Sequence, residues 1–120
     1  EKQRFAVCAA QISLAADPLI VSFDYDHTLS TEKGYNKALD WIAKGATLFI
    51  LTARCKDGNN LDLIKRAKDL KIPLTKVIFT CHQDKYKFIE DHSIDIHYDN
   101  NKEQVDKINQ NTDAKAILFE

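Results

Sequence analysis

Short apolar runs rich in β-branched residues alternate along this chain with segments whose apolar residues recur every three or four positions. The short runs predict buried strands over 19–23, 46–51, 76–80, 94–98 and 114–119. The longer segments predict helices over 34–44, 60–70, 84–92 and 102–109. Because strands and helices alternate, we predict an α/β fold with three Rossmann-like layers, in which helices cover both faces of a parallel five-stranded sheet.

The length of 120 residues suits a single domain. Between positions 5 and 16 the apolar residues recur at helical spacing, so we predict an N-terminal helix over 1–17 in front of a core over 18–120. A signal peptide is the alternative for this segment, but Gln11 and Ser13 interrupt its apolar run.

Charge and cysteine content argue against several classes of protein. The formal net charge of -1 provides no strong field toward nucleic acid or an anionic membrane. No apolar run approaches the length of a membrane span, so we expect no membrane association. Cys8, Cys55 and Cys81 form no C-x-x-C pair, which argues against a structural zinc site. Their odd number and wide spacing predict reduced thiols and a cytoplasmic location.

Polar residues follow the predicted strands at the points where those strands end. The carboxyl ends of parallel strands meet at one edge of the sheet, and the sites of such folds lie there. Singly, each of these residues is more often part of a turn, a helix cap or a solvated surface. Together they predict a site made of Asp24, Asp26 and Thr28 after the first strand, Thr52 and Arg54 after the second, Lys85 beyond the third and Asp99 after the fourth.

The acids in this set point to a hard cation. If strand geometry continues past Phe23, the side chains of Asp24 and Asp26 project to one side. Two neighbouring carboxylates repel each other and need a cation or a shared proton. Asp99 makes the site richer in oxygen, which suits Mg²⁺. A lysine and hydroxyl groups beside the ion would hold phosphoryl oxygens, so the residues predict magnesium-dependent phosphoryl chemistry.

The order of these residues resembles the haloacid dehalogenase (HAD) superfamily of phosphohydrolases, in its small form without a cap domain. Asp24-Tyr-Asp-His-Thr28 resembles the first motif, Thr52 the second, Lys85 the third and Asp99 the fourth, with Lys87 as a competitor for the third. The resemblance covers 19–119. It implies the strand order 5-4-1-2-3, which sets the nucleophile beside the fourth motif where the strand order reverses.

The resemblance implies a phosphatase that hydrolyses a phosphomonoester through an aspartyl-phosphate intermediate. In that mechanism Asp24 is the nucleophile, and Asp26 is the general acid and then the general base. Mg²⁺ would be held by the Asp24 side chain, the Asp26 carbonyl group and Asp99.

Four residues would serve the substrate. Thr52 and Lys85 would bind the phosphoryl group, and Thr28 would support the loop around it. Arg54 would meet a second phosphate or a carboxylate, or would instead pair with a surface acid. The chain has no room for a cap domain after the first motif or the third strand. In the family that the chain resembles, an open site of this kind often goes with large substrates, such as proteins or nucleic acid ends, or with capping by another subunit of an oligomer.

Two positions depart from the family pattern, and two other functions remain open. His27 stands where the family most often has Gly, and Asn100 stands where many members carry a second Asp. Neither replaces a residue that the chemistry requires. The first alternative is a catalytically inactive HAD-like interaction module that docks through the N-terminal helix. The second is an aspartyl-phosphate signalling domain, which needs an Asp after the third strand, where this chain has Thr80-Cys81-His82.

Overall fold

The computed structural model describes residues 18–120, and the helix predicted over 1–17 lies outside them. The strands are β1 (Ile20–Phe23), β2 (Thr47–Thr52), β3 (Val77–Phe79), β4 (Ile96–Asp99) and β5 (Lys115–Leu118). The α-helices are α2 (Glu32–Ala43), α3 (Leu61–Asp69), α4 (Tyr86–Asp91) and α5 (Lys102–Asn111). A helical turn, η1 (Tyr25–Leu29), follows β1, and a 3-10 turn, η2 (Leu74–Lys76), precedes β3. Among these described elements, no helix is long and apolar enough to cross a membrane.

All five strands form one parallel sheet in the order β3-β2-β1-β4-β5. The chain moves outward from β1 to β3 and then returns to place β4 on the other side of β1. The order therefore reverses between β1 and β4, and Ser22 of β1 lies directly beside His97 of β4. The predicted α/β class and the predicted strand order are both confirmed.

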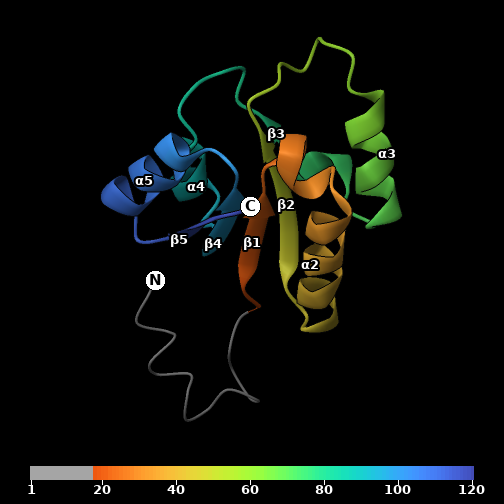
Figure 1. The fold of residues 1–120 in the computed structure, drawn as a ribbon, viewed down its shortest axis with the longest axis horizontal. Helices are drawn as coiled ribbons and strands as arrows, with labels where there is room; N and C mark the ends of the chain where they lie inside the picture. The colour runs from red at the N-terminus through yellow and green to blue at the C-terminus, as the bar shows by residue number, and fades with distance from the viewer. Residues whose placement is uncertain (1–17) are drawn as a thin grey trace.

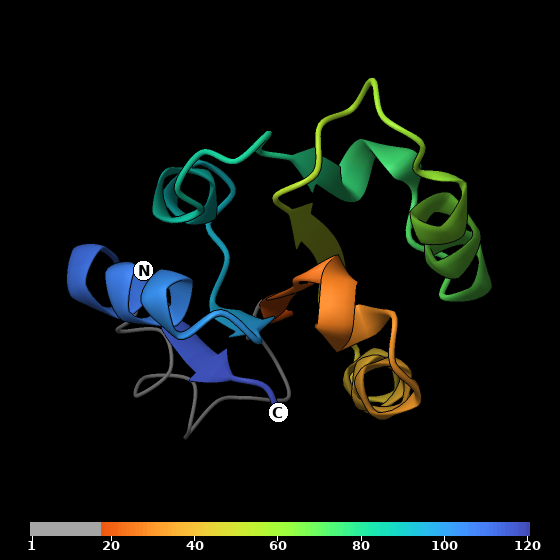
Figure 2. The same cartoon turned by 45° about the horizontal axis from the view of Figure 1, so that its top comes forward.

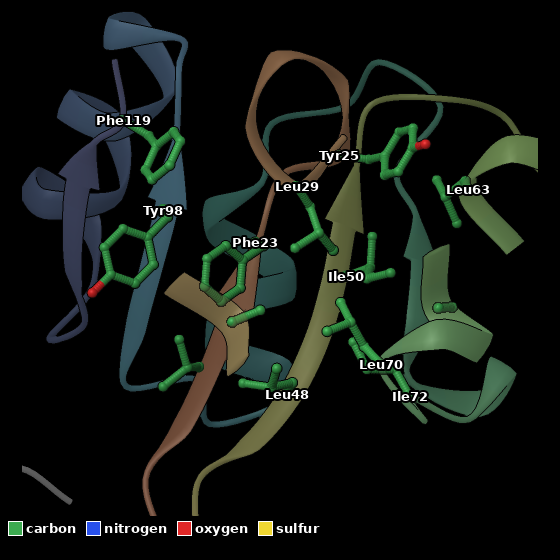
Figure 3. Close-up of a cluster of buried hydrophobic side chains, with 13 residues drawn as sticks. Phe23, Tyr25, Leu29, Leu48, Ile50, Leu63, Leu70, Ile72, Tyr98 and Phe119 are labelled. Carbon is green, nitrogen blue, oxygen red and sulfur yellow. The ribbon is translucent and has the colours of Figure 1, made fainter. Parts of the chain in front are cut away.

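Helices cover both faces of the sheet (Figures 1 and 2). Side chains alternate between the two faces along each strand, so neighbouring residues enter different cores. In β2, Leu48 and Ile50 pack toward α2 and α3, whereas Phe49 and Leu51 pack toward α4 and α5. Figure 3 shows the first of these clusters, which continues across the sheet to Tyr98 and Phe119.

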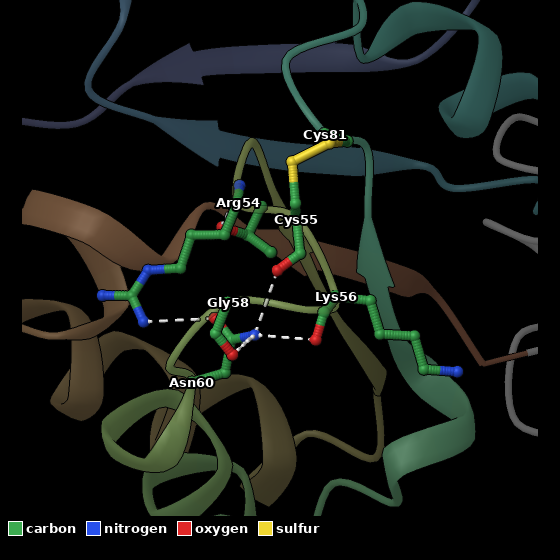
Figure 4. The surroundings of a disulfide bond; sticks show 7 residues. Arg54, Cys55, Lys56, Gly58, Asn60 and Cys81 are labelled. Carbon is green, nitrogen blue, oxygen red and sulfur yellow. Dashed lines mark hydrogen bonds between the residues drawn. A yellow bond between two sulfur atoms is a disulfide. The ribbon is translucent and has the colours of Figure 1, made fainter.

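A disulfide joins Cys55, just after β2, to Cys81, just after β3 (Figure 4). The prediction of reduced thiols is therefore wrong for these two residues. They are 26 residues apart in the sequence, but β2 and β3 are neighbours in the sheet and bring their Cα atoms to 4.2 Å. Cysteine spacing alone could not reveal this proximity. Reduced thiols consequently no longer support the cytoplasmic location predicted from them, and Cys8 lies outside the described residues.

Candidate active site

A pocket of about 300 Å³ opens at the carboxyl ends of β1 and β4, where the strand order reverses. Four of the predicted site residues line it: Asp24, Asp26, Lys85 and Asp99. The other three predicted residues, Thr28, Thr52 and Arg54, lie nearby but are not part of its wall. The remaining wall consists of His27, Ala53, His82, Gln83, Asn100, Asn101 and Gln104.

Lys85 joins the two buried acids at the base of the pocket. Its Nζ donates to Asp24 Oδ1 at 2.9 Å and to Asp99 Oδ2 at 2.6 Å. Lys85 comes immediately before α4, and its backbone N–H donates to Gln104 Oε1 of α5 at 3.0 Å, so two helices fix its position. Its side chain is buried, whereas Lys87 is exposed. Of the two candidate lysines, Lys85 is the one that reaches the acids.

The two acids beside Lys85 differ in their ease of ionisation. Burial raises the pKa of Asp24 from 3.8 to about 6, and the repulsion of Asp99 adds to this effect against the attraction of Lys85. Burial alone would also raise the pKa of Asp99, but hydrogen bonds from His97 and Lys85, together with the charge of Lys85, outweigh it and lower this pKa to about 2. Asp99 is therefore a fixed anion, while Asp24 gains its charge close to neutral pH.

The loop after β1 does not continue as a strand. The condition under which the Asp24 and Asp26 side chains would project to one side is therefore not met. Asp24 is still extended, with φ -63° and ψ 153°, but Tyr25–Leu29 turns into η1. His27 within this turn has φ 62°, a left-handed conformation that glycine adopts most easily. This conformation accounts physically for the preference for Gly that the resemblance implied at this position. The turn sends the two carboxylates to different partners.

Asp26 pairs with Arg54 through two hydrogen bonds. Arg54 Nε donates to Asp26 Oδ2 at 3.0 Å, and Nη2 donates to Oδ1 at 2.8 Å. The same guanidinium donates two further hydrogen bonds to Asp62 of α3, which lower the pKa of Asp62 to about 2. Arg54 also lies over the Tyr25 ring, 4.9 Å from its centroid. Arg54 was predicted to meet either a substrate anion or a surface acid. In the structure it pairs with the surface acid Asp62 and also orients Asp26.

Two predicted hydroxyl residues are buried beneath the pocket. Thr52 ends β2, and its Oγ1 accepts the Arg54 backbone N–H at 3.1 Å. Thr28 lies inside η1, and its Oγ1 has no hydrogen-bond partner within the described part of the chain. Gly34 allows α2 to pack against this turn, because a Cβ atom there would lie 1.9 Å from the Thr28 carbonyl oxygen. Support of the loop by Thr28 and phosphoryl binding by Thr52 both stay predictions.

The sequence-based prediction missed two buried polar residues behind Asp99. His97 and Ser22 are fully buried in β4 and β1 and hydrogen-bond each other between Nδ1 and Oγ at 2.6 Å. His97 Nε2 lies 2.8 Å from Asp99 Oδ2. The signal that could have found them is a polar residue inside each of two strands that were predicted to be buried.

The oxygen atoms at the site suit Mg²⁺ better than a softer metal. The Asn100 amide nitrogen donates to Asp24 Oδ2 at 2.9 Å and to the Asp26 carbonyl oxygen at 3.2 Å, in the amide orientation that satisfies both. These two oxygens share the Asn100 donor, and the Asp99 carboxylate lies near that of Asp24 because Lys85 donates to both. Within residues 18–120, no group of three or more His, Cys, Asp or Glu side chains could hold a metal. Two carboxylates, one carbonyl group and water fit the coordination habit of Mg²⁺, which would replace the Asn100 donor.

The chain matches no known protein-family model, and no curated protein sequence matches it. Its function therefore has to be inferred from its own residues and their geometry.

Proposed function

We propose that the chain is a magnesium-dependent phosphatase of the HAD type that hydrolyses a phosphomonoester through an aspartyl-phosphate on Asp24. The observation that carries this proposal is the buried Asp24–Lys85–Asp99 cluster at the carboxyl edge of a parallel sheet, where the strand order reverses. Burying two acids and a lysine is costly unless they serve one another or a ligand. A structural role alone does not require such a cluster to line an open pocket.

In the first step, an Asp24 carboxylate oxygen attacks phosphorus and forms the acyl phosphate. The bond between phosphorus and the leaving oxygen breaks, and that oxygen takes a proton from Asp26. In the second step, water attacks phosphorus, its proton passes to Asp26, and inorganic phosphate leaves the restored Asp24 carboxylate. The Asp26 side chain is 49% exposed, and each of its oxygens accepts from Arg54, so one oxygen would have to leave Arg54 and reach the leaving group while the other stays bound.

A negatively charged phosphoryl group is repelled by the carboxylates of Asp24 and Asp99, so the site needs positive charge to bind it. Bound Mg²⁺ would neutralise part of the phosphoryl charge and so reduce its repulsion of the nucleophile. Asp24, the Asp26 carbonyl group and Asp99 would hold the ion. Lys85 hydrogen-bonds both acids, and in the proposed reaction it would bind a phosphoryl oxygen next to them.

The open pocket favours a large or extended phosphorylated substrate. Only residues 24–31 separate β1 from α2, and only residues 80–85 separate β3 from α4, so neither connection holds a cap domain. The rim carries uncharged hydrogen-bonding groups, including Gln83 and Gln104, together with His27 and His82. Proteins and nucleic acid ends are the proposed substrate classes, and a second subunit of an oligomer would cover the site.

The direct test is hydrolysis of a generic aryl phosphate with Mg²⁺ or with EDTA. Wild type should require Mg²⁺, and Asp24→Asn should be inactive although folded. Asp40→Asn, which removes an exposed acid from α2, is the matched control and should retain full activity. A hydroxylamine-sensitive phosphoryl label on wild type but not on Asp24→Asn would identify the intermediate. Activity that persists in Asp24→Asn would refute the proposal, whereas a stable label without turnover would favour the signalling domain.

A further inference from the structure

His97 is a fully buried titratable residue that the proposed reaction does not use. Along β4, Tyr98 faces the α2 side of the sheet, so His97 and Asp99 both face the α4 and α5 side. Ser22 lies beside His97 in register on β1 and faces the same side. Strand alternation and register together therefore place Ser22, His97 and Asp99 on the same face of the sheet, with His97 between the other two.

Hydrogen bonding fixes how the imidazole is protonated. An ionised carboxylate can only accept, so His97 Nε2 must donate its N–H to Asp99 Oδ2 across 2.8 Å. His97 Nδ1 then has a free lone pair, and the Ser22 hydroxyl donates to it across 2.6 Å. A neutral ring therefore satisfies both neighbours.

These contacts hold Asp99 from several directions. Its Oδ2 accepts from His97 and from Lys85, and its Oδ1 accepts the Asn101 backbone N–H at 3.0 Å. The contact from Lys85 comes from the pocket and is available for exchange when a cation or a phosphoryl group arrives. The contacts from His97 and Asn101 come from the sheet and the loop and can persist through that exchange.

We propose that His97, oriented by Ser22, is a positioning residue that holds the Asp99 carboxylate ready for a divalent cation. The inference rests on the proposed function, since Asp99 is there a magnesium ligand. An apolar residue would fill the same space without burying polar groups that need hydrogen bonds, so packing alone does not explain the Ser22–His97 pair. Groups behind a metal ligand commonly fix its orientation and strengthen its binding of the metal.

The test is the affinity of the intact chain for Mg²⁺, measured by calorimetry without substrate. His97→Leu should weaken Mg²⁺ binding by about 10- to 100-fold. Ser22→Ala should weaken it less, because the imidazole still reaches Asp99, and His97→Gln, which keeps an N–H donor, should fall between wild type and His97→Leu. Tyr98→Phe is the matched control: it removes the acceptor of the Trp41 indole N–H on the other face of β4 and should leave Mg²⁺ affinity unchanged.

Two results separate this inference from the proposed function. Wild type that binds no Mg²⁺ would overturn both. Wild type that binds Mg²⁺, with folded His97→Leu binding it equally well, would overturn the role of His97 alone. If His97→Leu does not fold, Ser22→Ala decides, because unchanged affinity there refutes the orienting contact. Nitrogen NMR of the wild-type imidazole gives an independent readout, in which a proton on Nδ1 rather than Nε2 would contradict the proposed hydrogen bonds.

Discussion

Replacing Asp24 by Asn is expected to make the metal-free protein more stable while it removes the proposed activity. The Asp24 carboxylate is buried near Asp99, and it carries its charge there only above the raised pKa of about 6. Asn has nearly the size of the protonated acid and no charge, and its side-chain oxygen can still accept from Lys85. The substitution therefore removes a buried negative charge without opening a cavity.

The size and sign of the effect follow from this pKa. A rise from 3.8 to about 6 corresponds to about 3 kcal/mol. The folded protein binds the Asp24 proton more tightly than the unfolded chain does, so the stability contributed by this group is complete below about pH 4 and is lost as the pH rises through about 6. The Asp24→Asn variant has no group that ionises at this position, so it keeps this stability at every pH. The free energy of unfolding of the variant should exceed that of wild type by up to about 3 kcal/mol near pH 8, and by under about 1 kcal/mol near pH 4.

Urea unfolding in EDTA at both pH values measures this difference. Asp40→Asn shows how much of the change comes merely from removing one negative charge. Adding Mg²⁺ should reverse the order, because the ion stabilises wild type by mass action and finds no carboxylate at position 24 in the variant. If Asp24→Asn were less stable than wild type near pH 8 in EDTA, by an amount that did not depend on pH, the reasoning from burial would be refuted.

Three further predictions concern the support of the site. Cys81→Ser, or reduction of wild type, should lower the free energy of unfolding by about 3.5 kcal/mol, as expected for opening a cross-link between residues 26 apart. In the same urea titration, reductant should have no further effect on the variant. Gly34→Ala should lower the melting temperature, because the clash with the Thr28 carbonyl oxygen outweighs the gain of about 1 kcal/mol that Ala brings to a helix; a higher melting temperature would show that α2 moves away freely. Arg54→Lys keeps the charge but loses the planar guanidinium that donates two hydrogen bonds to Asp26, so kcat for an aryl phosphate should fall while KM changes little. A rise in KM alone would instead indicate that Arg54 contacts the substrate directly.

Strand periodicity was sufficient to predict most of the fold. β1 and β2 are short β-branched runs, and the helices between strands leave a parallel sheet as the natural arrangement. Because the carboxyl ends of such strands share an edge, the sequence alone predicts that Asp24, Lys85 and Asp99 meet. The structure brings these three residues together.

The details that periodicity missed depend on contacts between distant segments. The direction of the Asp26 side chain is set by the left-handed turn at His27 and by the hydrogen bonds from Arg54. Neither feature produces a periodic pattern in the sequence. The pairing of Cys55 with Cys81 depends on which strands are neighbours, and cysteine spacing does not report this. His97 lies inside the strand predicted over 94–98, and a polar residue at a buried strand position needs a partner that only the register identifies.

The disulfide also determines how the edge of the sheet can open. β3 has only three residues and pairs with β2 alone, so it is the strand most prone to separate from the sheet by local fluctuation. Backbone hydrogen bonds continue the pairing past β3, from Cys81 to Arg54 and from His82 to Ala53. The cross-link makes this short ladder open together with β2 rather than by itself. His82 and Gln83, which form one wall of the pocket, are thereby tied to the cooperative unit that contains Asp24, and amide exchange at this edge should report the opening of the sheet as a whole.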